Sequence, residues 1–178
     1  MRLKQFNYKK VKSTNQTAIR LIKSSKNEFG LIVSVAQSKG KGQYGRKWIS
    51  YKGNLFASFF HPFDENKFSI ERVTKLNCNL VKQTLSKYIK NKINFKKPND
   101  LLINKKKISG ILQEIITKSD KKFLITGIGI NVIKNPNIKN YPATNLYRII
   151  GKKINKSELE KNLKLVFENR ISKMYKIN

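Results

Sequence analysis

The feature that most constrains this chain is an apolar run that leads directly into a basic, glycine-rich stretch. Leu31 to Ala36 (LIVSVA) is short, continuous and dominated by β-branched residues, which is typical of a buried strand. Gln37 to Trp48 (QSKGKGQYGRKW) follows at once, with glycines alternating with lysines and an arginine. Glycine lets the backbone approach a ligand closely, and cations neutralise phosphate or carboxylate. The pattern indicates either a loop that covers an anionic, nucleotide-derived ligand or a solvated basic turn.

Composition favours one globular domain and leaves a nucleic-acid function open. The chain has 178 residues, of which 39% are hydrophobic and 10% aromatic, enough to bury the core of a single domain. Its net charge of +29 is typical of a nucleic-acid binder. Most of the 39 basic residues are lysines, which share AT-rich codons with the abundant asparagines and isoleucines. We therefore expect charge spread over every surface, whereas a nucleic-acid binder would concentrate arginine on one face.

The single cysteine and the single histidine exclude several kinds of site. Cys78 is the only cysteine, so there is no internal disulfide and no cysteine-rich metal site, and its place in a predicted helix favours an inert thiol. His61 is the only histidine, and its neighbours Pro62 and Asp64 indicate an exposed loop. Neither the apolar core of a signal peptide nor an apolar run of membrane-spanning length is present. We expect a soluble, cytoplasmic protein.

Apolar residues at helical spacing predict helices after Ser13, after Ser69 and from 156 to 174. Ser13 and Gln16 form a capping-box pattern for the first of these helices, which is expected to end near Ser24. The hydroxyls and the amide at its start either only cap the helix or also hold a small polar ligand. The sequence alone favours capping.

Apolar and β-branched stretches predict the strands. Residues 48–50 and 54–60 indicate a strand pair that Pro62 closes. Residues 123–132 (FLITGIGINV) indicate a further strand, whose two glycines give a flat surface and whose Asn131 presents an amide. The full GxGxxG fingerprint of a dinucleotide site is not present.

The stretch INFKKPNDLLINKKKISGIL predicts a hairpin with charged residues near one end. Its first strand ends at Pro98, because proline has no N–H to donate to a ladder. Asp100 follows at the strand exit, a turn is expected at 104–106, and Lys107 begins the next strand. If the turn is tight, these two charged side chains face one site. The alternatives are a surface turn residue and one more solvated lysine.

Five short motifs occur in an order that resembles one known family. They are STN at 13–15, QSKGKGQYGRKW at 37–48, NLFASF at 54–59, KKPNDLLINKKKISGIL at 96–112 and GIGIN at 127–131. Together they closely resemble the catalytic domain of biotin protein ligase, and the resemblance covers nearly the whole chain. PND followed by KxxGIL is the most specific part of the match.

The resemblance implies an α+β fold of the class II synthetase-like biotin/lipoate ligase type, in which α-helices flank a mixed β-sheet. It implies an ATP-dependent ligase that forms biotinyl-5′-AMP and transfers biotin to a lysine of a biotin carboxyl carrier protein. Joining a carboxylate to a triphosphate brings like charges together, so lysines, an arginine and Mg²⁺ must offset the repulsion. The implied partners are biotin, ATP and the carrier protein, without DNA or a membrane.

The resemblance also assigns residues to roles. Lys107 is expected to contact the activated carboxyl and the α-phosphate, and Asp100 to orient or deprotonate the incoming carrier lysine. The expected biotin pocket consists of Ser13, Thr14, Asn15, Gln37, Lys41, Gly42, Gln43, Lys107 and Gly110. The expected ATP site consists of Gly40, Lys41, Arg46, Lys47, Trp48, Asn99 and Asn131, whose amide is suited to the adenine edge. No residue is assigned to a metal ion.

The sequence departs from the family pattern in three places. The family loop usually reads GRGRxGR, and here Lys41 and Gln43 replace two arginines, which predicts weaker retention of the adenylate. Lys97 replaces the tryptophan of the usual WPND, which affects packing near Asp100. We expect a single catalytic domain over 1–178, with neither a DNA-binding helix-turn-helix nor a C-terminal β-barrel, and therefore a minimal enzyme without a repressor role.

Two other functions remain open. Lipoate ligases and octanoyl transferases share this fold, although their Gly-Gly-Gly and His-Asp signature is missing here. A basic nucleic-acid-binding module would account for the net charge through salt-dependent contacts with phosphates.

Overall fold

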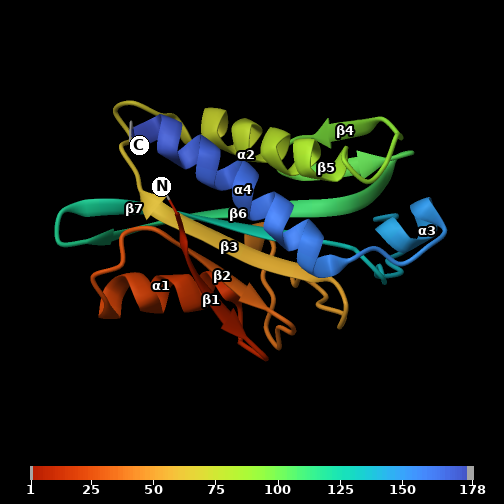
Figure 1. Ribbon diagram of the computed structural model, residues 1–178, viewed down its shortest axis with the longest axis horizontal. Coiled ribbons are helices and arrows are strands. Elements are labelled where there is room, and N and C mark those ends of the chain that lie inside the picture. Colours follow the sequence, from red (N-terminus) through yellow and green to blue (C-terminus); the bar gives the residue numbers. More distant parts are fainter. Residues whose placement is uncertain (1, 176–178) are drawn as a thin grey trace.

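The computed structural model describes residues 2–175, which form a seven-stranded sheet with helices on both faces (Figure 1). The sheet order is β1-β2-β3-β7-β6-β5-β4; β1 runs parallel to β2, and the other neighbouring strands are antiparallel. The predicted mixed sheet flanked by helices is therefore confirmed. The elements are β1 (Lys4–Tyr8), α1 (Thr14–Ser24), β2 (Gly30–Ser34), a 3₁₀ turn (Gln43–Gly45), β3 (Leu55–Pro62), α2 (Ile70–Leu85), β4 (Ile93–Lys96), β5 (Asp100–Ile103), β6 (Lys106–Lys118), β7 (Lys121–Ile130), α3 (Leu146–Ile150) and α4 (Lys156–Tyr175).

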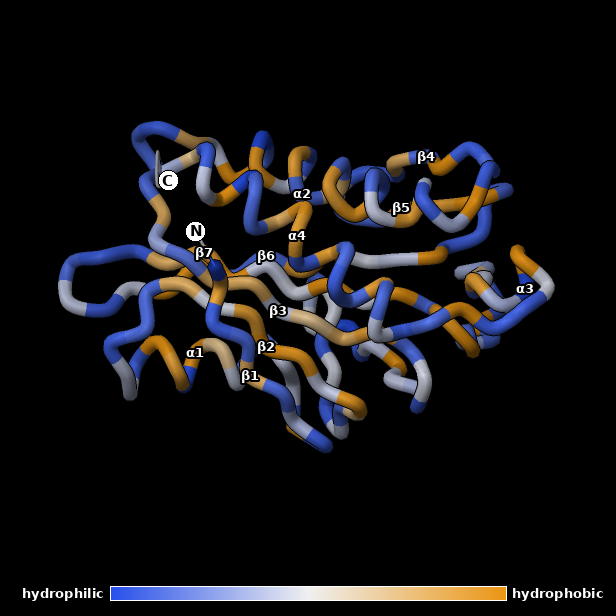
Figure 2. The backbone as a smooth tube through the Cα atoms, in the orientation of Figure 1, coloured by the Kyte–Doolittle hydropathy of each residue, from blue (hydrophilic) through white to orange (hydrophobic). Residues whose placement is uncertain are grey.

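The alternation of side chains along each strand decides which residues face α1 and which face α2 and α4. In β2, Ile32 packs with Ala18 and Ile22 of α1, whereas Leu31 and Val33 belong to the core beneath α2 and α4. Successive strand residues point to opposite faces, so one strand supplies both layers. Figure 1 shows α1 on one side of the sheet and α2 with α4 on the other. Figure 2 shows hydrophobic stretches along β2 and β3, between these layers.

The helices predicted from apolar spacing are confirmed. α2 begins after Ser69, whose hydroxyl accepts a hydrogen bond from the Arg72 N–H at 3.3 Å. A polar side chain at this position satisfies an amide that has no partner within the helix. α4 buries one apolar stripe against the sheet and α2, made of Leu159, Leu163, Phe167 and Ile171.

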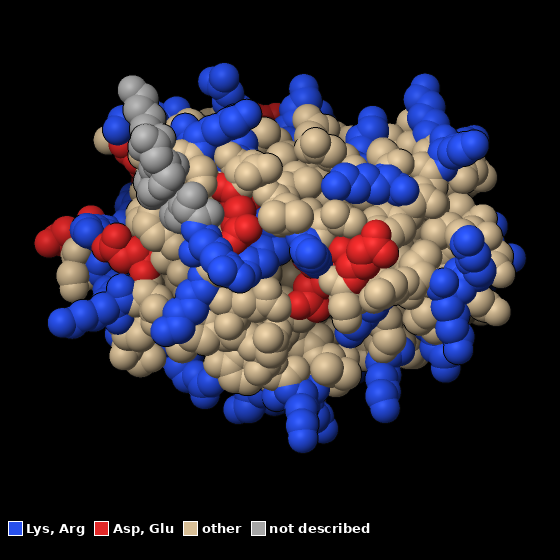
Figure 3. Space-filling model, viewed as in Figure 1, with Lys and Arg blue, Asp and Glu red and all other residues tan. Residues whose placement is uncertain are grey.

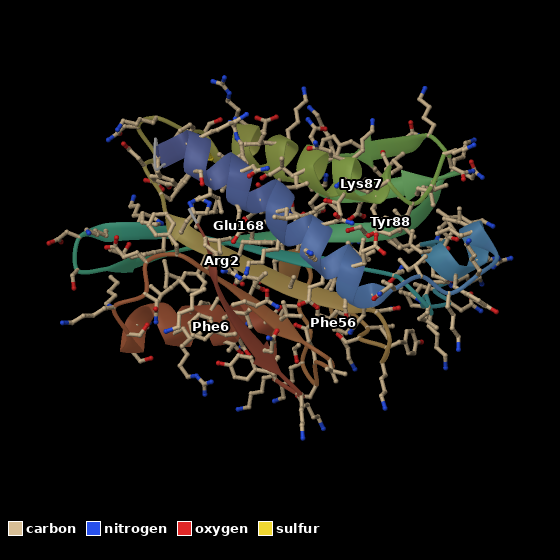
Figure 4. All side chains as sticks on the ribbon, viewed as in Figure 1. Arg2, Phe6, Phe56, Lys87, Tyr88 and Glu168 are labelled. Atoms are coloured by element: carbon tan, nitrogen blue, oxygen red, sulfur yellow. The ribbon has the colours of Figure 1, made fainter. Side chains whose placement is uncertain are left out.

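α4 fastens two distant parts of the chain. Glu168, on its buried side, accepts a hydrogen bond from the backbone N–H of Leu3 at 2.6 Å. Nearer the start of the helix, Asn162 accepts from Lys87 Nζ at 3.2 Å and donates to the Tyr88 hydroxyl at 2.7 Å. Glu168, Lys87 and Tyr88 can be followed in Figure 4. These contacts hold α4 to both β1 and the end of α2.

Two predictions around β3 are wrong. Residues 48–50 form no strand, because Trp48 turns into the molecule and pairing begins only at Leu55. His61 is not in an exposed loop: it lies within β3 and is only 5% exposed. Its Nδ1 lies 2.7 Å from the Pro62 carbonyl oxygen and 2.9 Å from the Tyr175 hydroxyl. Burial lowers the pKa of His61 to about 4, since a charged ring would lose its hydration.

Within residues 2–175, none of the helices has the length and apolar character needed to cross a membrane. Figure 3 shows lysine and arginine side chains scattered over one face of the molecule, with acidic side chains between them. On this face the charge is spread as the composition predicted.

Candidate active site

A cavity of about 340 Å³ brings together nearly all the residues that the sequence assigned to a site. It lies between the start of α1, the glycine-rich loop (37–48), the β4–β5 turn, strands β6 and β7, and the 131–145 segment. Of the expected site residues, all except Gly40 line it: Ser13, Thr14, Asn15, Gln37, Lys41, Gly42, Gln43, Arg46, Lys47, Trp48, Asn99, Asp100, Lys107, Gly110 and Asn131.

Gly40 closes the base of the glycine-rich loop. Its carbonyl oxygen accepts a hydrogen bond from the Trp48 N–H at 2.9 Å. A Cβ on Gly40 would lie 2.6 Å from the Trp48 carbonyl oxygen and 2.7 Å from Ser50 Oγ. Any larger residue would push the two ends of the loop apart. The structure therefore gives Gly40 a role in loop closure, outside the cavity lining.

Gln37, and not the Ser13 side chain, caps α1. Its Oε1 accepts hydrogen bonds from the Thr14 N–H at 2.8 Å and the Thr14 hydroxyl at 3.1 Å, and its Nε2 donates to Ser50 Oγ at 3.1 Å. Ser13 occupies the N-cap position without a side-chain capping bond, so the predicted capping box is wrong. Because Gln37 supplies the missing acceptor, the Ser13 side chain is left to line the cavity.

Asn15 is held in one orientation by neighbours on two sides. Its Nδ2 donates to Glu114 Oε2 at 2.7 Å, and its Oδ1 accepts from Ser58 Oγ at 2.6 Å. Gly127 leaves room for it, since a Cβ at that position would overlap the amide. The contact with Glu114 was not predictable from the sequence, because an acidic residue within a strand usually indicates a solvent-exposed side chain.

The indole of Trp48 packs on the flat surface that the glycines provide. A Cβ on Gly110 would lie 2.8 Å from Trp48 Cζ3, and one on Gly129 would overlap Cε2 and Cζ2. The ammonium of Lys107 lies 5.2 Å from the ring centre, within cation–π range. Trp48 Nε1 is buried and has no hydrogen-bond partner among residues 2–175. The group that packs against Gly110 in this structure is therefore the indole ring of Trp48.

Lys107 and Asp100 form an ion pair across one hairpin, as a tight turn predicted. Lys107 Nζ lies 2.7 Å from Asp100 Oδ1, and the two side chains are 25% and 14% exposed. Asn104 and Lys105 both adopt positive φ, 48° and 62°, which is the backbone of a two-residue hairpin turn. Water therefore screens the attraction between these two charges less than it would for a fully exposed pair.

The 131–145 segment is fastened to the backbone of Lys107. The Lys107 N–H donates to the Pro142 carbonyl at 2.8 Å, and the Thr144 N–H donates to the Lys107 carbonyl at 2.9 Å. Asn131 Nδ2 donates to the Thr144 carbonyl at 3.1 Å, which fixes the amide with its NH₂ group on the carbonyl side. Asn131 Oδ1 is buried without a partner among residues 2–175, and it remains the acceptor of this side chain.

Asn99 and Cys78 are two further polar residues near Asp100. Asn99 Nδ2 donates to the Ile111 carbonyl at 2.6 Å and so holds the β4–β5 turn against β6. Burial raises the pKa of the Cys78 thiol to about 12, and the charge of Asp100 adds to the shift. A thiol with such a pKa is not a nucleophile at neutral pH, in agreement with the inert role expected for Cys78.

Several lining residues were not found from the sequence. Tyr44 stands at the tip of the glycine-rich loop, 86% exposed and with a positive φ of 55°. Lys96 precedes the β4–β5 turn, and Ile138 and Tyr141 enter from the 131–145 segment. The one available signal was Tyr141, an aromatic residue in the polar loop around Pro142.

Comparisons with known proteins agree with this architecture. The sequence matches the Biotin/lipoate A/B protein ligase family over residues 8–131. It is 34% identical over 166 residues to the bifunctional ligase/repressor BirA of Bacillus subtilis, which covers 89% of this chain and 50% of that protein. The chain thus spans about half the length of that relative.

The solved structures that share the fold include two biotin protein ligases. One is the biotin protein ligase of Aquifex aeolicus in complex with biotin and ATP, with a TM-score of 0.79 and 29% identity over 98% of this chain and 73% of that one. Another is the biotin protein ligase of Leishmania major in complex with biotinyl-5-AMP, with a TM-score of 0.75 and 25% identity over 92% of this chain and 72% of that one. The family match covers most of the chain, including the start of α1, the glycine-rich loop and both residues of the ion pair. The chain belongs to the biotin/lipoate A/B protein ligase family.

Proposed function

We propose that this chain is the catalytic domain of a biotin protein ligase, which activates biotin with ATP and transfers it to a lysine of a biotin carboxyl carrier protein. The observation that carries the proposal is the pair of Lys107 and Asp100, 2.7 Å apart, in a cavity lined by both the expected biotin residues and the expected ATP residues. Family membership and the ligands of the similar solved structures support it. We place the reaction in the cytoplasm, where ATP is available.

In the first half-reaction a carboxylate oxygen of biotin attacks the α-phosphorus of ATP. An oxygen–phosphorus bond forms, the bond from the α-phosphorus to the bridging oxygen breaks, and pyrophosphate leaves with that electron pair. Two anionic groups must meet, so catalysis depends on cations placed where the charge develops. Lys107 lies deepest among the lining cations, with Lys41 and Arg46 exposed on the loop above it. Lys107 would therefore serve the carboxyl–phosphate junction.

In the second half-reaction the ε-amine of the carrier lysine attacks the acyl carbon of the adenylate. An amide bond forms, the acyl–phosphate bond breaks, AMP leaves, and the amine gives up a proton. In the structure Asp100 is paired with Lys107 and orients it. When Lys107 turns to the phosphoryl oxygens, the Asp100 carboxylate is free to accept the proton from the incoming amine. One ion pair would thus serve both steps.

A magnesium ion would reach this cavity bound to the phosphates of ATP. Among residues 2–175, no group of three or more His, Cys, Asp or Glu side chains could hold a metal, and Asp100 is the carboxylate that lines the cavity. Mg²⁺ is often held by phosphate oxygens, waters and only one or two carboxylates, so this donor set is sufficient. When bound, the ion would neutralise part of the triphosphate charge.

The deciding experiment is the intact mass of a biotin carrier domain incubated with this protein. Reactions would contain ATP and biotin, ATP and lipoate, or biotin without ATP. We expect one biotinyl group to be added, with release of pyrophosphate, only with ATP and biotin together. Modification of the carrier with ATP and lipoate, but not with ATP and biotin, would overturn the proposal in favour of a lipoate ligase. Salt-dependent binding to duplex DNA without either reaction would favour the nucleic-acid module.

A further inference from the structure

Three segments of the chain meet at the mouth of the cavity around Tyr141. Its hydroxyl accepts a hydrogen bond from Arg46 Nη1 at 2.8 Å. The guanidinium carbon of Arg46 lies 5.2 Å from the centre of the tyrosine ring, and Lys96 Nζ lies 5.6 Å from it. Arg46 belongs to the glycine-rich loop, Lys96 ends β4, and all three residues line the cavity.

The ring gathers the two cations without neutralising them. Within the described part of the chain, neither Arg46 nor Lys96 forms an ion pair with a carboxylate. Two like charges at one place repel each other, and the negative face of an aromatic ring offsets part of that cost. A carboxylate in the same position would cancel charge, whereas a tyrosine leaves the positive charge available to an anion. Arg46 also retains donors, since a guanidinium has five N–H groups and Tyr141 takes one.

Tyr141 has a defined position relative to the Lys107–Asp100 pair. The next residue, Pro142, accepts a hydrogen bond from the Lys107 N–H at 2.8 Å, and the Tyr141 N–H donates to the Ile138 carbonyl at 3.0 Å. The segment that carries the ring is thus tied to the strand that carries Lys107. Lys107 and the two cations at Tyr141 therefore line one cavity, on segments that backbone hydrogen bonds join.

We propose that Tyr141 is a positioning residue that assembles Arg46 and Lys96 into a subsite for the outer phosphates of the nucleotide. The proposal rests on the proposed function, because it assumes that ATP occupies this cavity. It adds Tyr141 and Lys96 to the ATP site, because the residues expected for that site included neither of them. Tyr141 acts through the two cations, so its loss should weaken binding of ATP and pyrophosphate but leave AMP and biotin binding unchanged.

The test compares Tyr141→Ala and Tyr141→Phe with the matched control Tyr147→Ala. The Tyr147 side chain is 45% exposed, close to the 41% of Tyr141, and it does not line the cavity. Calorimetry with MgATP, pyrophosphate, AMP and biotin gives each dissociation constant. We expect Tyr141→Ala to weaken ATP and pyrophosphate binding about tenfold, and Tyr141→Phe, which keeps the ring, to weaken them about threefold. AMP and biotin constants should stay within about twofold of the wild type, as should all constants of Tyr147→Ala.

The proposal is overturned if Tyr141→Ala leaves ATP and pyrophosphate binding unchanged, or weakens AMP and biotin equally, which would indicate a structural role. A second measurement uses the Arg46→Gln/Lys96→Gln background, in which Tyr141→Ala should cause no further loss of ATP affinity. If Tyr141→Ala lowered ATP affinity as much in that background as in the wild type, the proposal would also be contradicted. Binding constants can be measured without turnover. A wild-type protein that binds ATP but makes no biotinyl adenylate would refute the proposed function, and the role of Tyr141 in ATP binding would still be tested.

Discussion

The indole of Trp48 lies so close to Gly129 that a Cβ on the glycine would overlap two of its ring carbons. Trp48 comes from the end of the glycine-rich loop and Gly129 from β7, so the contact joins the loop to the floor of the cavity. Lys107 lies over the same ring at 5.2 Å. The loop, the floor and the lysine therefore depend on one aromatic side chain.

Gly129→Ala should displace the Trp48 ring and weaken ATP binding about tenfold, because overpacking of this kind typically costs about 1–3 kcal/mol. Calorimetric titration with MgATP measures the effect. Gly30→Ala is the matched control: its Cβ would overlap the Phe60 ring in the core, away from the cavity lining. We expect it to lower the thermal midpoint without a selective loss of ATP affinity. Equal ATP affinities in the two variants would contradict the role given to Trp48.

Lys107→Ala should reduce biotin-dependent pyrophosphate exchange by about a hundredfold or more, as loss of a preorganised charge partner at a reacting centre does. The fold should persist with some loss of stability, because Asp100 would keep a poorly solvated charge without its partner. Lys106→Ala removes an adjacent lysine that does not line the cavity, and it should retain full exchange. Near wild-type exchange by Lys107→Ala would remove this lysine from the mechanism.

Asp100→Asn should slow transfer to the carrier about tenfold more than it slows adenylate formation, because the amide cannot accept a proton from the incoming lysine. Single-turnover assays of the two half-reactions separate these effects. Asp120→Asn makes the same substitution in the exposed β6–β7 turn and should change neither rate. If both half-reactions of Asp100→Asn fell equally, the carboxylate would instead serve to place Lys107 or the nucleotide.

Gln43→Arg should slow release of biotinyl-5′-AMP about tenfold. Gln43 lines the cavity, and an arginine there would add a positive charge and a planar set of donors for the phosphate. Dissociation of labelled adenylate measures the effect. Lys39→Arg, at an exposed position outside the cavity lining, tests whether any new arginine in this loop suffices. Unchanged release from Gln43→Arg would show that the neighbouring lysines already compensate.

His61 should make the protein less stable in mild acid. The folded state keeps the ring neutral down to about pH 4, whereas an unfolded histidine binds a proton near pH 6.5. Between these values the unfolded state binds more protons, so the stability present above pH 6.5 falls as the pH drops toward 4, by on the order of 3 kcal/mol in total. Urea denaturation at pH 7 and pH 5 measures it. In His61→Gln the difference between the two pH values should shrink, and an unchanged difference would assign it to other groups.

The Lys107–Asp100 pair was predictable from the sequence because it is local. Both residues belong to one hairpin, and the turn between them sets which side chains meet. The register was not predictable in detail: a shift between Leu101 and Leu102 places Asp100 opposite Gly110 and Lys107 opposite Leu102. Such a bulge depends on the packing of the neighbouring strands, which the spacing of apolar residues does not record.

Contacts between distant segments were not predictable in the same way. Arg46 meets Tyr141 across 95 residues, and Asn15 meets Glu114 across 99. Tyr141 and Glu114 were not among the expected site residues, and only the folded arrangement of the segments brings each pair together. The exposed position expected for His61 failed for a related reason, since Pro62 ends β3 one residue beyond it and the strand is central.

The hydrogen bond from the Thr14 N–H to Gln37 Oε1 links the first turn of α1 to the first residue of the glycine-rich loop. That amide proton is shielded only while the loop stays in place, because no carbonyl within the helix can take it. Its exchange with deuterium from the solvent therefore reports the opening and closing of the loop at a single backbone position. Motion over the cavity can in this way be followed without a ligand or a label.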